Sequence, residues 1–195
     1  MKILILLTLF VCQIFAAPPP GAVKYRSILT REAHFHLGLN APIPMFAAQI
    51  EQESAWRPGI TAWDNGRGLA QFMDPTTNFI TKLYPELGKA APYSPAWAIP
   101  ALIRYDVWIY KRVKGETECH RWAAALKGYN AGLGYVLQAQ KASDRPGIWF
   151  DATEFVKTKQ SAKNFEYSRM YPRWVLFKRQ LNYSTWGAVT CHEYL

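Results

Sequence analysis

The sequence is poor in cysteine and in acidic residues, and it has no long apolar run after its first residues. Its 195 residues include 3 cysteines, and 14 acidic residues stand against 23 basic ones. The apolar run at residues 3–15 is shorter than the ~20 residues that a membrane-spanning helix needs. Repeats, low-complexity tracts and alternating strand patterns are also scarce. The sequence therefore argues against an integral membrane protein, a repeat protein and a sheet-rich fold.

Residues 1–17 have the pattern of a secretory signal peptide. One basic residue, Lys2, precedes the apolar run, and the small residues Ala16 and Ala17 follow it. We therefore expect an exported protein, periplasmic or extracellular, with no integral membrane segment after cleavage. Residues 18–22 are rich in proline and predict a stiff linker. Residues 23–195 are then enough for one domain with its own core and too few for two.

The cysteine count predicts a disulfide. Cys12 is removed with the signal peptide, which leaves Cys119 and Cys191 in an oxidising compartment. A bond between them would pin the C-terminal tail to the domain and contribute ~4 kcal/mol by restricting the unfolded chain. His120 and His192 adjoin the cysteines, so a Cys/His metal site is the alternative, but neither pair has the usual gap between zinc ligands. We expect the disulfide, no metal and no cofactor.

Helical patterns dominate the rest of the chain. Asn40 should cap a helix that runs to Trp56, and Thr117 should cap a later one. Pro172 should kink the last helix. Residues 58–68 fit turns or a small hairpin better than a helix. We predict a mainly α fold with this irregular segment as the exception, its helices covering residues 40–56, 75–84, 95–113, 117–130, 133 onward and 161–181.

Two carboxylates lie near the end of the helix that precedes the irregular segment. Glu51 and Glu53 are on opposite flanks of its apolar stripe, and periodicity alone does not choose between them. Gln49 and Trp56 lie on the Glu53 side. A carboxyl group that is partly buried against aromatic and apolar neighbours keeps its proton near neutral pH, as the acid of glycoside cleavage must. Glu53 is therefore the candidate acid, and the alternative is an ordinary solvated helix carboxylate.

Three short motifs carry a resemblance to a known family. They are the pair Glu53-Ser54, the run GLAQFM at residues 68–73, and the run ALKGYNAG at residues 125–132. The last is similar to the alanine-tyrosine-asparagine-alanine-glycine signature of soluble lytic transglycosylases. With their order and separations, the motifs cover residues 44–173. The sequence therefore resembles the soluble lytic transglycosylases and the related goose-type lysozymes.

The resemblance implies a lysozyme-like, mainly α single domain with a groove for peptidoglycan strands and the irregular segment beside that groove. In the family one Glu, here Glu53, protonates the bond that follows N-acetylmuramic acid (MurNAc). The same Glu then acts as base on the 6-hydroxyl of that sugar. The product is a 1,6-anhydro sugar, and no water is consumed. The implied function is a peptidoglycan lytic transglycosylase.

The resemblance also implies binding roles by position. Ser54 would orient the acid, and Gln71 and Met73 would line the groove. Tyr129 and Asn130 would hold the sugar near the reacting centre. Tyr129 suits this role because it offers an apolar ring and a polar hydroxyl. The alternative for Tyr129 is a core aromatic at a helix end.

Glu166 is a further candidate for a sugar subsite. Family members place a second Glu just before a tyrosine-valine pair that begins the last helix, and Glu166 is the nearest match, offset by one residue. The alternative is an ion pair with Lys163 or Arg169 at helical spacing. The aromatic candidates for the groove walls are Trp56, Trp63 and Tyr93.

The irregular segment departs from the family pattern. Most such transglycosylases have small residues where this sequence reads AWDNGR at residues 62–67. Asp64 and Asp74 are closer to goose-type lysozymes, in which acidic residues near these places accompany the catalytic Glu. If either faced Glu53 across a water molecule, it could act as a general base and the bond would be hydrolysed. The alternatives are a turn residue for Asp64 and a helix cap for Asp74.

The net positive charge of the sequence indicates which kinds of partner it would attract. A net charge of +9 in an exported protein suits anionic cell-wall polymer or a membrane surface better than nucleic acid, although it could serve solubility alone. We expect a monomer that acts on peptidoglycan glycan strands, in wall turnover or with secretion, conjugation or phage lysis machinery. Goose-type muramidase activity is the near alternative, and a wall-binding or assembly module without catalysis is another.

Overall fold

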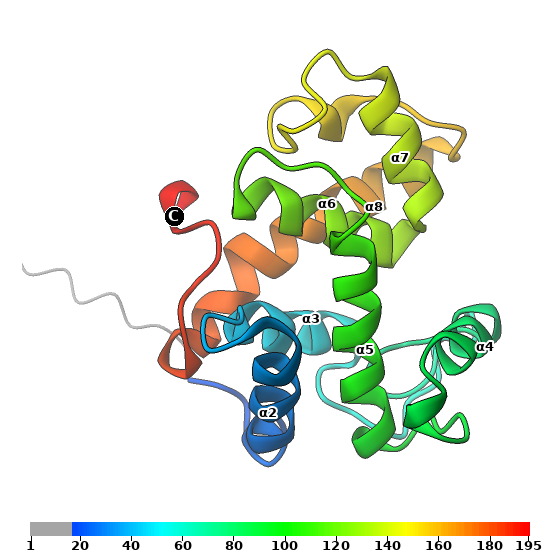
Figure 1. Ribbon diagram of the computed structural model, residues 1–195, viewed down its shortest axis with the longest axis vertical. Helices are drawn as coiled ribbons and strands as arrows, with labels where there is room; N and C mark the ends of the chain where they lie inside the picture. Colours follow the sequence, from blue (N-terminus) through cyan, green and yellow to red (C-terminus); the bar gives the residue numbers. More distant parts are fainter. Residues whose placement is uncertain (1–16) are drawn as a thin grey trace, which may run out of the picture.

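The computed structural model describes residues 17–195 and is mainly helical, as the sequence predicts (Figure 1). The predicted signal peptide lies outside the described residues, except for Ala17. Among the described residues, no helix is both long and apolar enough to cross a membrane. The α-helices are α1 (Pro20–Val23), α2 (Arg26–Leu37), α3 (Ile43–Ser54), α4 (Asp74–Leu83), α5 (Pro95–Tyr110), α6 (Glu118–Ala131), α7 (Leu133–Ala142) and α8 (Ala162–Arg173). The shorter 3-10 or π segments are η1 (Pro85–Leu87), η2 (Thr153–Phe155), η3 (Trp174–Arg179), η4 (Gln180–Trp186) and η5 (His192–Tyr194).

Helix α3 runs through the core. Met45, Phe46 and Ile50 are fully buried, and α3 packs against α2, η3 and η4. Burying a large apolar side chain contributes roughly 1.5–3 kcal/mol, so this helix is a main source of stability. Because α3 is held on several sides, the side chains at its C-terminal end have fixed positions.

The two ends of α3 differ from the prediction. Asn40 does not cap the helix: the residue that precedes the first turn is Pro42, and no side-chain cap is formed. Pro44 lies in the first turn, where its fixed φ suits the helix and its missing N–H is not needed. The helix ends at Ser54 because Ala55 and Trp56 adopt left-handed φ values of 48° and 61°. This reversal directs the chain away from the helix axis and into the irregular segment.

Helices α5, α6 and α8 form a second group of packed helices. Helix α6 packs against α5 on one side and α8 on the other. The predicted cap is confirmed, because Thr117 Oγ1 accepts a hydrogen bond of 3.3 Å from the His120 N–H. The helix predicted at 161–181 is divided into α8, η3 and η4. Regular α-helix ends one residue after Pro172, which lacks the N–H that the pattern requires.

The irregular segment between α3 and α4 contains two isolated antiparallel bridges, which join Thr61 to Arg67 and Arg67 to Phe72. It therefore folds back on itself as a small hairpin-like loop, as predicted. Gly68 has a φ of 68°, and a Cβ at this position would lie 1.9 Å from the Pro92 carbonyl oxygen. Only glycine fits there, so Gly68 fixes how closely the loop approaches the chain before α5.

The N-terminal part is more ordered than the sequence predicts. The expected linker at residues 18–22 contributes to α1, and Ala22 is fully buried in the core. Helix α2 was not predicted, yet it buries Leu29 and Ala33 and packs against α3 and α5. Its apolar stripe is narrow and is masked by basic and histidine residues, which explains why periodicity failed to reveal it.

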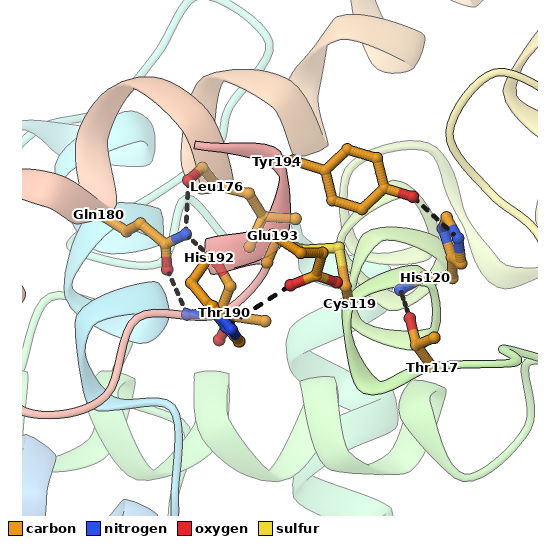
Figure 2. The surroundings of a disulfide bond; sticks show 10 residues. Thr117, Cys119, His120, Leu176, Gln180, Thr190, His192, Glu193 and Tyr194 are labelled. Atoms are coloured by element: carbon orange, nitrogen blue, oxygen red, sulfur yellow. Dashed lines mark hydrogen bonds and ion pairs between the residues drawn. A yellow bond between two sulfur atoms is a disulfide. The ribbon is translucent and has the colours of Figure 1, made fainter.

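The predicted disulfide between Cys119 and Cys191 is confirmed, and it joins α6 to the C-terminal tail (Figure 2). Gln180 holds the same tail from η4: its Nε2 donates to the carbonyl oxygens of Leu176 and Thr190 at 2.5 Å, and its Oε1 accepts from the Thr190 N–H at 3.2 Å. The tail is thus fixed by one covalent bond and by a buried amide.

Candidate active site

Glu53 lies in the last turn of α3, at the wall of a cavity of about 430 Å³. The other walls come from the irregular segment, the start of α4, α5, the junction of α6 and α7, and α8. Six predicted site residues lie around the cavity with Glu53. They are Trp63, Asp64, Gln71, Met73, Tyr129 and Asn130.

The surroundings of Glu53 make it a weaker acid than an ordinary glutamic acid. Loss of hydration in the protein interior is the largest cause, and it raises the pKa of Glu53 to about 7. The negative charge of Asp64 raises this pKa further, whereas a hydrogen bond from Tyr171 lowers it. Near neutral pH, Glu53 therefore exchanges its proton readily and can serve as acid and then as base.

The structure also distinguishes Glu53 from Glu51 by the contacts that each carboxyl group makes. The Glu51 carboxylate pairs with Arg179 Nη1 at 3.1 Å and accepts a hydrogen bond of 2.6 Å from the Tyr183 hydroxyl. These partners come from η3 and η4, and neither Glu51 nor its partners line the cavity. Glu51 therefore ties α3 to the C-terminal segments, and Glu53 remains as the candidate acid.

Tyr171 is a site residue that the sequence did not reveal. Its hydroxyl donates a hydrogen bond to Glu53 Oε1, and its side chain is almost fully buried. Burial and the neighbouring Glu53 raise the pKa of Tyr171 well above its usual range, so the hydroxyl keeps its proton and remains a donor. Tyr167, one helical turn earlier on α8, also lines the cavity. This spacing was a usable signal, but nothing in the sequence placed α8 beside α3.

Tyr129 joins α6 to the irregular segment. Its hydroxyl donates a 2.6 Å hydrogen bond to the Ala70 carbonyl oxygen. Its ring lies 5.7 Å from that of Phe72 and 5.6 Å from that of Tyr105, centroid to centroid. The residue is half-buried, with a face in the cavity. Tyr129 therefore has features of both predicted roles, the sugar-binding residue and the core aromatic, because it belongs to an aromatic cluster and also lines the site with Asn130.

Gln71 and Trp63 have special conformations at the cavity. Gln71 adopts a left-handed φ of 50°, which is costly for a residue other than glycine, and its Nε2 donates to the Gly68 carbonyl oxygen at 2.8 Å. This bond fixes the Gln71 side chain at the cavity wall. Trp63 is 96% exposed, although it lines the cavity. A large apolar ring that the protein leaves in water is available to pack against a ligand.

Ser54 and Trp56, both predicted site residues, do not line the cavity. The Ser54 hydroxyl donates to the Ile50 carbonyl oxygen at 3.2 Å, and the residue is buried in α3, so it does not orient the acid directly. Trp56 is also not a groove wall. The left-handed turn carries it into the core, where its Nε1 donates to the Tyr183 hydroxyl at 2.7 Å and its ring contacts that of Trp186. Both predictions are corrected.

The two candidates for a second carboxylate, Asp64 and Asp74, have different surroundings in the structure. Asp64 lines the cavity and acts on the Glu53 pKa, and it also stabilises its turn, since its Oδ1 accepts from the Gly66 N–H at 3.2 Å. Asp74 forms an ion pair with Arg67 and does not line the cavity. Nor is Asp74 the helix cap, because α4 begins at Asp74 itself and Met73 precedes it. Of the two, only Asp64 lies where it can act on the reaction.

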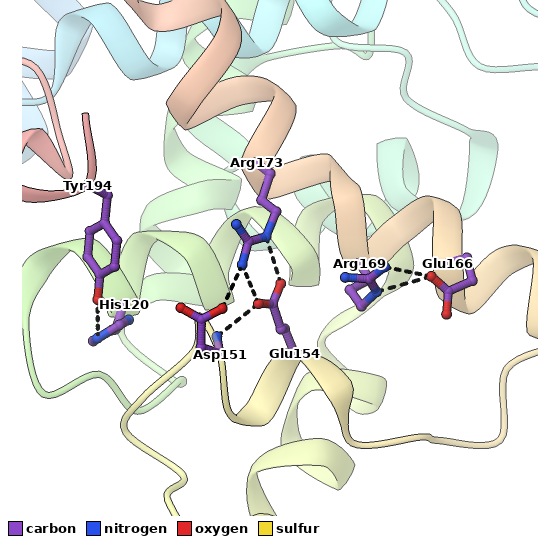
Figure 3. Close-up of polar contacts among 7 residues, drawn as sticks. All are labelled: His120, Asp151, Glu154, Glu166, Arg169, Arg173 and Tyr194. Atoms are coloured by element: carbon purple, nitrogen blue, oxygen red, sulfur yellow. Dashed lines mark hydrogen bonds and ion pairs between the residues drawn. The ribbon is translucent and has the colours of Figure 1, made fainter.

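Glu166 lies outside the cavity, contrary to its predicted subsite role. It is exposed on α8, and Arg169 binds it through Nη2 at 2.8 Å and Nε at 3.1 Å (Figure 3). The alternative of an ion pair at helical spacing is therefore correct. Arg173 continues this row of contacts, with Nη2 at 2.6 Å from Glu154 Oε1 (Figure 3). Tyr93 also lies outside the cavity, and its hydroxyl is 2.8 Å from Thr61 Oγ1.

A second buried carboxyl lies in the core near the acid. Asp106 on α5 is fully buried, and its Oδ1 accepts a 3.3 Å hydrogen bond from Gln49 Nε2, one turn before Glu53 on α3. Burial raises the pKa of Asp106 well above its usual range, and the charge of Glu53 raises it as well. Both effects disfavour the charged form of Asp106 beside the Glu53 site. Nothing in the sequence indicated Asp106, because it lies within a long apolar helix.

A cavity of about 630 Å³ beside the disulfide has different chemistry. Its carboxylates, Glu118 and Glu193, are exposed and lie at the surface. Within residues 17–195 no group of three or more His, Cys, Asp or Glu side chains could hold a metal ion. The cavity of Glu53 is therefore the best-supported reaction site.

Comparison with protein families gives an independent assignment. The family model described as the Transglycosylase SLT domain matches residues 38–151, which is more than half of the chain. The matched range includes Glu53, the irregular segment and the Tyr129-Asn130 pair, and Tyr171 lies beyond it. None of the curated proteins compared with the chain matches it.

Proposed function

Because the chain belongs to the transglycosylase SLT domain family, whose members generally act on peptidoglycan, we propose that it is a peptidoglycan lytic transglycosylase. The proposed reaction cleaves the β-1,4 bond between MurNAc and N-acetylglucosamine (GlcNAc) and leaves 1,6-anhydro-MurNAc. The observation that carries the proposal is the pKa of about 7 at Glu53, in a cavity lined by aromatic and amide side chains.

The proposed mechanism uses Glu53 twice. In its neutral form it donates its proton to the glycosidic oxygen, and the bond from C1 of MurNAc to that oxygen breaks. GlcNAc leaves with a hydroxyl group at its C4. The MurNAc 6-hydroxyl then attacks C1, and the Glu53 carboxylate takes the hydroxyl proton as the C1–O6 bond forms. Glu53 ends protonated, so no water or external base is consumed.

Tyr171 has a defined part in this cycle. Its hydroxyl donates to Glu53 Oε1, so it stabilises the carboxylate that exists only after the first proton transfer. A hydrogen bond to a charged group contributes about 1.5–3 kcal/mol. Tyr171 therefore lowers the barrier for proton donation, while burial leaves a large fraction of the resting Glu53 protonated near neutral pH.

Hydrolysis by a goose-type muramidase is the second candidate, and Asp64 is the observation that favours it. Asp64 lines the same cavity and its charge acts on Glu53. If a water molecule between Asp64 and the sugar attacked C1, the product would have a reducing end. A wall-binding module without catalysis is disfavoured, because such a module has no need of a carboxyl group with a pKa near 7.

Mass spectrometry of digested peptidoglycan tests the proposal. Anhydro-ended muropeptides from the unaltered protein and none from Glu53→Gln would support it. Glu51→Gln is the matched control, since it removes a carboxylate two residues away that faces Arg179 and Tyr183. Reducing ends would establish the muramidase, and retention on the wall without cleavage would establish a binding module. Full lysis by Glu53→Gln would show that another residue is the acid.

We further propose that the protein acts outside the cytoplasm, in the periplasm or the extracellular space, as a monomer. Peptidoglycan lies there, and the Cys119–Cys191 disulfide suits an oxidising compartment. N-terminal sequencing of exported protein tests this, because cleavage near Ala17 is expected. Retention of the first residues in the mature protein would contradict it.

A further inference from the structure

Another cavity, of about 640 Å³, adjoins the cavity of Glu53. We call it the lysine cavity. The two cavities share the residues Trp63, Asp64, Asn130, Ala131 and Tyr167. The outer wall of the lysine cavity comes from the segment before α8 and from α8 itself, and contains Lys159, Gln160, Ser161, Lys163, Asn164 and Ser168. A ligand that lies beside Glu53 can therefore extend into the lysine cavity without leaving the protein surface.

The outer wall of the lysine cavity is positively charged. Lys159 and Lys163 are exposed, and in the described part of the chain neither takes part in an ion pair. The nearest acidic side chain on α8, Glu166, is bound by Arg169. The remaining carboxylate is Asp64, at the edge shared with the Glu53 cavity. Two ammonium groups therefore face this cavity with free capacity to bind an anion.

A third lysine lies behind the same wall. Lys127 on α6 is 4% exposed, and its ammonium donates to Gln160 Oε1 at 3.2 Å and to the Ser168 hydroxyl. Gln160 and Ser168 both line the lysine cavity. Burial lowers the pKa of Lys127 to about 8, which leaves it mostly charged at neutral pH. Its charge adds to the positive potential of the wall and also fixes two of the wall's polar side chains.

We infer that the lysine cavity binds the peptide stem of peptidoglycan through the stem's carboxylates, and this inference rests on the proposed function. A glycan strand of N-acetylated sugars has no charge of its own when the lactyl group of MurNAc is in amide linkage to the stem. The anionic groups of the substrate are then on the peptide, which branches from the MurNAc held beside Glu53. Lys159 and Lys163 lie where such a branch would leave the Glu53 cavity.

The two lysines lie in a part of the chain that the family model does not match. Lys159 and Lys163 lie beyond residue 151, where the match to the family model ends. The acid, the irregular segment and the Tyr129-Asn130 pair lie within the match. The outer wall of the lysine cavity and the α8 tyrosines of the Glu53 site therefore lie outside the matched range, whereas the rest of the Glu53 site lies within it.

The test compares turnover of peptide-bearing and peptide-free glycan strands by the mature protein. In Lys159→Gln/Lys163→Gln, kcat/KM for peptide-bearing strands should fall about tenfold, the effect of losing two modest ion pairs. Turnover of peptide-free strands should stay unchanged. Strands whose stem carboxylates are amidated should be cleaved alike by variant and parent. The matched control, Lys89→Gln/Lys141→Gln, removes the same two charges outside both cavities and should behave as the parent.

Three results would overturn the inference. An equal loss on peptide-free strands would mean that the lysines hold the sugars, and an equal loss in the control pair would mean that only net charge matters. Undiminished cleavage of amidated strands by the parent, together with inhibition by inorganic phosphate, would assign the cavity to a phosphate group. Calorimetric binding of a muramyl peptide to Glu53→Gln, with and without the lysine substitutions, separates the two proposals. Lysine-dependent binding without cleavage by the parent would refute the proposed function and keep the peptide site.

Discussion

Replacing Glu53 by Gln should stabilise the protein at neutral and alkaline pH while it removes activity. In the unfolded chain the Glu53 carboxyl titrates near its ordinary value of 4.5, whereas in the fold its pKa is about 7. The folded state thus binds this proton more tightly. The protonated Glu53 therefore stabilises the folded state relative to the unfolded one. This stabilisation is complete below pH 4.5 and is lost as the pH rises to 7, where the folded carboxyl must ionise in a poorly hydrated place.

The magnitude follows from the two pKa values. Each pH unit between 4.5 and about 7 corresponds to about 1.4 kcal/mol, so the total is about 3 kcal/mol. Gln cannot ionise, and its carbonyl oxygen can still accept the hydrogen bond of Tyr171. Glu53→Gln should therefore have a free energy of unfolding that exceeds that of the parent by up to about 3 kcal/mol at pH 8.

The assay is urea unfolding of parent and Glu53→Gln at pH values from 4 to 8. The difference between their free energies of unfolding should grow between pH 4.5 and 7 and then level off. Glu51→Gln should not show this growth, because its Glu53 is intact. A difference that does not change with pH would refute the reasoning, since it would mean that Glu53 has the same pKa in the folded and unfolded chains.

The other predictions concern neighbouring parts of the structure. Tyr171→Phe removes a hydrogen bond that lowers the pKa of Glu53. The alkaline limb of the plot of kcat/KM against pH should therefore move upward by about one pH unit, and kcat should fall about tenfold. An unchanged alkaline limb would show that Tyr171 does not act on the pKa of Glu53. Gly68→Ala places a methyl group 1.9 Å from a carbonyl oxygen at a φ of 68° and should destabilise the fold by about 2 kcal/mol or more, as measured by urea unfolding. Gly134→Ala is its control, because a Cβ there meets nothing within 4 Å and alanine is the better helix former, so stability should be kept or rise. Cys191→Ser removes a disulfide between residues that are 72 positions apart. It should lower the free energy of unfolding by about 4 kcal/mol on the chain-entropy model. A change below about 1 kcal/mol in thermal and urea unfolding would show that other contacts hold the tail.

The sequence predicts those features that depend on local rules. The Thr117 cap, the irregular segment and the order of most helices follow from side chains within a few residues of each other. The disulfide follows from the cysteine count and the expected compartment. Helix α2 was missed because its apolar stripe is narrow, and the Asn40 cap was wrong because proline at the start of α3 supplies the helical geometry without a side-chain cap.

The site depends on contacts that no local rule reveals. Glu51 and Glu53 are equivalent by periodicity, and only Arg179 and Tyr183, which follow them by more than 120 residues, show that Glu51 is structural. Tyr171 meets Glu53 across 118 residues. Two left-handed residues turn Trp56 into the core, and left-handed φ values are hard to anticipate for Ala and Trp.

The most direct test of the central claim is the titration of Glu53 itself, followed by the carbon-13 shift of its carboxyl group in the mature protein, with Glu53→Gln used to assign the signal. The account predicts a midpoint near pH 7 and a higher midpoint in Tyr171→Phe. A midpoint near 4.5 would contradict it, because Glu53 would then have released its proton well below neutrality and could not serve as the acid.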